Sequence, residues 1–235
     1  MLVHPARAAE LKVLSAGAIE PGLRAAAAAY QRETGVEVRI NFATAPQLRK
    51  RVGSGEAADV LIAPPALIEE FARDRKVAQL RANVGRVGLG VAVRPGAPEP
   101  DISSAATLER AVVEAESITF NTASSGLYFE GLLKKMGIYE SVRGKTTRYP
   151  DGASVMEHLL KGTGREIGFG PITEILQFRD KGLRFVGPLP AEVQNYTSYT
   201  AAPHRAASNV EAAAAFVRYL ASSAGKALFT AAGIE

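Results

Sequence analysis

The chain contains no cysteine and only three histidines among its 235 residues. The absence of cysteine excludes disulfide bonds, thiol catalysis and zinc sites built on cysteine. His4, His158 and His204 are far apart and do not have the spacing of metal ligands, so we expect no metal site. No apolar stretch approaches the ~18 residues that a membrane-spanning helix needs. The dinucleotide fingerprint and the phosphate-binding loop are also missing, and we expect no bound cofactor.

The chain also lacks a large excess of either charge, because 28 basic and 24 acidic residues leave a net charge of only +4. The sequence has no basic stripe interleaved with aromatic residues, so nucleic-acid binding is not expected. A mild positive bias suits a small anionic ligand, although it is more often simply that of a solvated surface.

The first residues, "MLVHPARAAELKV", place Ala6, Arg7 and Ala8 just before Ala9 and Glu10. This pattern resembles the small-residue end of a secretory signal whose apolar part is missing. An ordinary frayed N-terminus explains the same residues equally well. The first interpretation predicts a periplasmic protein whose signal peptide has been removed.

Strand and helix patterns alternate along residues 11–187, which is typical of βαβ units and a parallel sheet. Capping-box patterns at Ser154 and Glu157, and at Ser208 and Glu211, predict the beginnings of two helices. The sequence therefore predicts the α/β class.

Two features favour a pair of lobes. The strand expected at 86–93 is longer than its neighbours, and the proline-rich stretch "GPLPAEVQNY" at 187–196 precedes a final strand and helix. Both segments would carry the chain from one lobe to the other.

Small or hydroxylic residues occupy nearly all of the turns where an expected strand passes into a helix. These turns are residues 15–18, 43–46, 121–126, 151–154 and 170–173. In parallel sheets, ligands bind at such strand ends, where unpaired backbone N–H groups and helix dipoles hold an anion without a charged side chain. For any one turn, packing and capping are the simpler explanation, but five such turns favour a binding site.

Six stretches together resemble the periplasmic molybdate-binding protein family, the solute receptors of ABC uptake systems. The resemblance spans nearly the whole chain in order, and its specificity comes from the sequence and spacing of the pieces. The stretches are "LKVLSAGA", "VEVRINFATAPQLRKRVGSGEAADVLIAPP", "RVGLGVAVRPG", "SSGLYFEGLLKKMGIYE", "REIGFG" and "VEAAAAFVRYLASSAGKALFTAAGI".

The resemblance implies a two-lobed periplasmic-binding-protein-like fold that closes like a hinge over an anion. Each lobe would be a mostly parallel sheet flanked by helices, with residues 1–84 and 195–235 in lobe one, 85–194 in lobe two, and the ligand cleft between them. A membrane permease would be a transient partner, and the protein would be a monomer. The candidate ligand-binding residues are Ala16, Gly17, Ala18, Thr44, Ala45, Asn121, Ser124, Ser125, Gly126, Ala153, Ser154, Pro171 and Thr173.

Departures from the family argue against molybdate as the ligand. The family uses serine hydroxyls at the first two turns, where this chain has Ala18 and Ala45, and the tyrosine that closes the site falls near Pro171. A site with fewer hydroxyls suits a larger anion such as a small organic acid. Arg148 or Arg86 could pair with its carboxylate, although for each a surface charge is the simpler explanation.

An alternative from another class is an isomerase of a small carboxylate, because relatives of this superfamily include a periplasmic aconitate isomerase. Such a reaction needs a base at the ligand and donors for the developing charge. The turns supply backbone donors, but no base is identifiable from the sequence, and no residue is assigned a catalytic role. The effector domain of a transcription regulator ranks last, because the chain lacks a helix-turn-helix segment.

Overall fold

A computed structural model of the chain describes residues 10–235. The signal-like residues Ala6, Arg7, Ala8 and Ala9, and also His4, lie outside the described residues. Among residues 10–235, no helix combines the length and the apolar character needed to cross a membrane.

The chain divides into two compact units. Unit 1 contains Met1–Gly85 and Ser198–Glu235, and unit 2 contains Arg86–Thr197. The chain passes from one unit to the other within strand β4 (Ala82–Val93) and returns within strand β9 (Tyr196–Pro203). From the sequence, these two passages are expected after residues 84 and 194.

Unit 1 is built on a sheet in which three strands are parallel. Strand β1 (Glu10–Ala16) lies between β2 (Glu37–Ala43) and β3 (Val60–Ala63), and β9 pairs with β3 in the antiparallel sense. Every residue of β3 is buried, because helices cover both faces of the sheet at this position.

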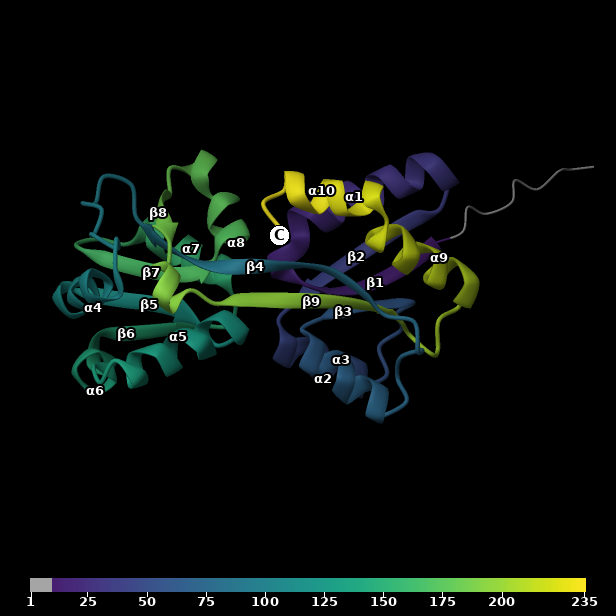
Figure 1. The fold of residues 1–235 in the computed structure, drawn as a ribbon, viewed down its shortest axis with the longest axis horizontal. Coiled ribbons are helices and arrows are strands. Elements are labelled where there is room, and N and C mark those ends of the chain that lie inside the picture. The colour runs from purple at the N-terminus through teal and green to yellow at the C-terminus, as the bar shows by residue number, and fades with distance from the viewer. Residues whose placement is uncertain (1–9) are drawn as a thin grey trace, which may run out of the picture. The chain divides into compact units, whose positions relative to one another are not determined.

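Helices cover both faces of the unit 1 sheet (Figure 1). Helices α2 (Ala45–Gly53) and α3 (Pro65–Arg73) lie on one side, whereas α1 (Glu20–Thr34) and α10 (Ser223–Ala231) lie on the other. A further helix, α9 (Val210–Ala221), packs against α1 and α10. A side chain on Gly22 in α1 would overlap Phe229 of α10, so glycine is what allows these two helices to lie so close.

Unit 2 has its own sheet, whose parallel part carries the candidate site. Strand β5 (Ser117–Asn121) lies between β7 (Glu166–Pro171) and β6 (Thr146–Tyr149), and all three are parallel. Strand β4 runs antiparallel to β7 and also pairs with β8 (Arg184–Pro188).

Helices cover both faces of the unit 2 sheet (Figure 1). Helices α4 (Ala105–Glu114) and α5 (Ser124–Lys135) pack on one face, and α7 (Gly152–Lys161) and α8 (Ile172–Leu176) pack on the other. A short helix α6 (Tyr139–Val142) follows α5. Short 3-10 turns occupy Gly17–Ile19, Arg143–Lys145, Arg179–Lys181 and Ala191–Val193.

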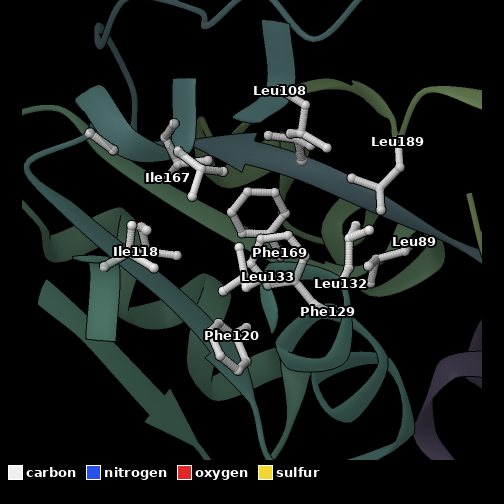
Figure 2. Packing of buried hydrophobic residues seen from close by; sticks show 14 of the residues in the cluster. Leu89, Leu108, Ile118, Phe120, Phe129, Leu132, Leu133, Ile167, Phe169 and Leu189 are labelled. Carbon is white, nitrogen blue, oxygen red and sulfur yellow. The ribbon is translucent and has the colours of Figure 1, made fainter. Parts of the chain in front are cut away.

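The core beneath α4 and α5 centres on aromatic side chains (Figure 2). The rings of Phe129 and Phe169 stack with centroids 3.8 Å apart, and Phe120 meets Phe129 edge to face at 5.3 Å. Alternation along β4 places Leu89 in this core and Ala92 in the core beneath α7. Burying each of the larger side chains contributes ~1.5–3 kcal/mol to the stability of the fold. The cores on the two faces of the sheet therefore hold in place the strands whose ends carry the candidate site.

Both capping-box predictions are wrong in their details. Helix α7 begins earlier than Ser154 suggests, because Asp151 is the N-cap and its side chain accepts from the Ser154 amide. Helix α9 is capped by Asn209, whose side chain accepts from the amide of Ala212. Ser208 instead hydrogen-bonds to Asp59.

Candidate functional site

The strand ends of unit 2 bring the candidate residues of that unit to one edge of its sheet. Asn121 at the end of β5 is in register with Tyr149 of β6, and Phe120 is in register with Phe169 of β7. Because the three strands are parallel, the turns that follow them leave at the same edge. The candidate residues at this edge are Asn121, Ser124, Ser125, Gly126, Ala153, Ser154, Pro171 and Thr173.

The turn between β5 and α5 is organised by the buried side chain of Asn121. Its Oδ1 accepts from the amides of Ala123 at 2.9 Å and Gly126 at 3.1 Å, and its Nδ2 donates to Ser125 Oγ at 2.9 Å. A side chain on Gly126 would overlap the backbone carbonyl of Asn121. Asn121 therefore shapes the turn, and among the described residues the amides of Ser124 and Ser125 are left without a hydrogen-bond partner.

The beginning of α7 shows the same arrangement. Asp151 Oδ1 accepts from the Ser154 amide at 2.8 Å, so this amide is already used. The amides of Gly152 and Ala153 have no hydrogen-bond partner within residues 10–235. With the two free amides of α5, they give unit 2 four backbone donors at two helix N-termini, which is an arrangement that favours an anion.

Glu174 is an acidic residue at this edge that is not among the candidates expected from the sequence. It belongs to α8, directly after the buried Thr173, and its Oε2 is shielded from solvent. Its carboxylate lies against Gly152, because a side chain on Gly152 would overlap Glu174 Oε2. Gly152 is the only sequence signal for this contact, because no local sequence pattern links residues on two different helices.

The candidate residues of unit 1 lie at the end of β1 and β2. These strands are parallel and Ala16 is in register with Ala43, so the turns at Gly17 and Thr44 follow from the same edge of that sheet. The Thr44 amide donates to the Gln47 side chain at 2.8 Å.

The first turn of unit 1 offers no side-chain hydroxyl to a ligand. Ser15 is fully buried and donates to the carbonyl of Ala16 at 3.1 Å, and Ala18 is buried too. At the second turn, Ala45 carries an amide with no partner in the part of the chain that the structure describes. Of these two turns, the second therefore offers a backbone donor at Ala45.

The two arginines considered as carboxylate anchors have other contacts. Arg148 forms an ion pair with Glu130 at 2.5 Å and lies over the ring of Phe120. The Lys134 side chain hydrogen-bonds to Glu130 and, with Arg148, lowers the pKa of that carboxyl group. Arg86 is exposed and lies over the Tyr196 ring, with 4.3 Å between the guanidinium carbon and the ring centroid. The contacts of Arg148 therefore stabilise unit 2, and its guanidinium group is already paired with a carboxylate of the protein.

Two further polar side chains, Asp59 and His158, have structural partners. Asp59 is buried and accepts from the amides of Lys12 and Ser208, each at 2.7 Å. His158 pairs with Glu166 at 2.9 Å. Within residues 10–235, no group of three or more His, Cys, Asp or Glu side chains could hold a metal ion.

Comparison with known proteins identifies the family. A family model described as bacterial extracellular solute-binding protein matches residues 11–235. The chain belongs to this family. Among its curated relatives is an aconitate isomerase of a Pseudomonas species, which is 30% identical over 226 residues, covering 93% of this chain and 85% of the relative.

Solved structures of this solute-binding fold align with nearly the whole chain. The periplasmic molybdate-binding protein of Azotobacter vinelandii aligns with a TM-score of 0.76 at 16% identity, covering 96% of this chain and 98% of that one. A sulfate-binding protein of Mycobacterium tuberculosis aligns with a TM-score of 0.78 at 17% identity, covering 96% and 86%. The predicted α/β fold and the resemblance to molybdate-binding proteins are confirmed, and identities this low establish the fold alone.

Proposed function

We propose that this solute-binding protein captures a small organic acid anion in the periplasm for an ABC-type importer. The observation that carries the proposal is the set of four unpartnered amides at the edge of unit 2, from Ser124, Ser125, Gly152 and Ala153. Amides at helix N-termini bind carboxylates through hydrogen bonds and the helix dipole. Family membership supports a binding role for these donors.

We propose that backbone groups of unit 1, at Gly17 and Ala45, also serve anion binding. Alanine at positions 18 and 45 removes the hydroxyl groups that a tetrahedral oxyanion would use, and this supports an organic acid over molybdate. The protein acts as a monomer, with the permease of the importer as its transient partner.

A second candidate function is isomerisation of a small carboxylate. It is supported by the 30% identity with the aconitate isomerase and by the carboxylate of Glu174 beside the first residue of α7. In such a reaction Glu174 would take a proton from the carbon next to a substrate carboxylate, the double bond would move by one position, and the proton would return to the far carbon. The free amides would stabilise the negative charge that develops on the carboxylate.

A ligand panel followed by a turnover assay tests both functions. The full chain is heated with molybdate, sulfate, citrate, cis-aconitate and trans-aconitate, and the melting temperature is measured. A ligand at 100 times its Kd stabilises a protein by about 2.7 kcal/mol, or ~5–10 °C for a chain of this size. We expect this shift with a carboxylate and not with molybdate. Proton NMR of the mixture then separates the functions: an unchanged acid supports capture, and an isomerised acid supports the enzyme.

A further inference from the structure

A separate pocket lies in unit 2, at the opposite edge of the sheet from the candidate site. It has a volume of about 210 Å³ and is bounded by α4, the loop that joins β4 to α4, and the beginning of β7. Strand β7 begins at Glu166 beside this pocket and ends at Pro171 in the candidate site, so about 17 Å of strand separates the two. The pocket is therefore not part of the candidate anion site.

The floor of this pocket is apolar and belongs to the aromatic core of unit 2. It consists of Val93 of β4, Ala111 of α4, Ala115 directly after α4, and Ile167 of β7. Glu166 also lines the pocket, but its carboxylate already accepts from Ser117 and pairs with His158, each at 2.9 Å. The volume is below the ~300 Å³ at which pockets for drug-sized ligands begin, so the floor accepts a small apolar group.

The rim of the pocket carries one unpaired charge of each sign. Arg110 and Glu114 are exposed and lie one turn apart on α4. Within residues 10–235 neither side chain forms an ion pair, although their spacing of four residues would allow one. Arg110 is attracted only to Asp101, whose carboxylate accepts from the Ser103 amide at 2.9 Å. The other charges of the rim are paired, Glu99 with Arg184 and Arg165 with Glu116.

We propose that this pocket binds a free amino acid with an apolar side chain. Along the helix axis, Arg110 and Glu114 are ~6 Å apart. The carboxylate and the ammonium group of an amino acid are attached to the same carbon, so they can reach Arg110 and Glu114 together while the side chain enters the apolar floor. Arginine holds a carboxylate through two parallel hydrogen bonds, and the ammonium group donates to Glu114. A ligand with a single charge leaves the other residue of the rim without a partner.

This inference does not depend on the proposed function, because no residue of the pocket belongs to the candidate anion site. Both charged side chains are exposed to solvent, so we expect a dissociation constant of about 0.1–1 mM rather than tight binding.

The test is a titration of the full chain with L-leucine, followed by ¹H–¹⁵N NMR and by calorimetry. Two analogues measure what each charge contributes, because 4-methylpentanoate lacks the ammonium group of leucine and 3-methylbutylamine lacks its carboxylate. We expect leucine to shift the amide signals of Ala111, Ala115 and Ile167. We also expect it to bind about fivefold or more tightly than either analogue.

Two variants remove the proposed charged contacts one at a time. Arg110→Gln and Glu114→Gln should each weaken leucine binding by about fivefold or more. Glu109→Gln is the matched control, because it removes a charge from the same helix outside the pocket, and it should bind leucine like the parent chain.

Three results would overturn the proposal. Leucine could leave the three amide signals in place at concentrations up to about 20 mM, well above the expected dissociation constant. The two analogues could bind as tightly as leucine, or Arg110→Gln and Glu114→Gln could bind it like the control. None of these results affects the proposed anion site, which the carboxylate panel tests separately.

Discussion

Replacing Asn121 by alanine should destabilise unit 2, because one buried side chain holds the turn between β5 and α5. The variant leaves the amides of Ala123 and Gly126 without the Oδ1 acceptor that they share. Gly126 is buried, so its unsatisfied amide costs about 1–3 kcal/mol, and the half-buried Ala123 amide adds about 1 kcal/mol. The expected loss of ~3 kcal/mol corresponds to a fall of about 6–12 °C in melting temperature.

Asn121→Asp tests whether the hydrogen bonds to the two amides account for the stability that Asn121→Ala loses. An aspartate oxygen still accepts both amides next to the N-terminus of α5, and Ser125 Oγ can rotate to donate to it. We expect this variant to lose less than half as much stability as Asn121→Ala in thermal and urea unfolding. Thr122→Ala, at an exposed neighbour, is the control and should melt like the parent. A fall of less than 2 °C for Asn121→Ala, or an equal fall for Asn121→Asp, would refute the reasoning.

Three further predictions concern other positions. Asp59→Asn should cost about 2–4 kcal/mol in urea unfolding, because an NH₂ group replaces an oxygen that accepts a backbone amide of Lys12 or Ser208; a loss below 1 kcal/mol contradicts this. Gly152→Ala should lower carboxylate affinity at least tenfold in calorimetry, because the added methyl group overlaps Glu174 Oε2 and must shift the start of α7, which carries two of the free amides; unchanged affinity would contradict this. Burial and the charge of Lys76 lower the pKa of His204. The contribution of His204 to stability is therefore present above its unfolded pKa of about 6.5 and is lost as the pH falls. Between about pH 7 and 5, the melting temperature of His204→Gln should fall less than that of the parent chain, and equal falls would contradict this prediction.

The α/β class and the strand-end turns could be predicted from the sequence because both follow from local residue patterns. Buried strands such as Val60–Ala63 are continuous apolar runs, and the turn after β5 is marked by Asn121 and Gly126. The small residues at these turns have local causes as well, since Gly126 must be glycine to pass the Asn121 carbonyl.

Capping and long-range contacts were harder to predict. Asp151 and Ser154 can both cap a helix, and only the path of the chain decides which one does. The ion pair of Arg148 depends on Glu130, and the contact of Glu174 depends on Gly152, a residue on another helix. Such contacts follow from the order in which β7, β5 and β6 lie in the sheet, and hydrophobic periodicity does not encode that order.

The most direct test of the central claim is a ¹H–¹⁵N NMR titration of the full chain with trans-aconitate and citrate. The amides of Ser124, Ser125, Gly152 and Ala153 should show the largest downfield proton shifts within unit 2, because they gain a charge-assisted hydrogen bond on binding. The account is contradicted if an acid binds and these four signals stay in place while shifts gather elsewhere in the unit.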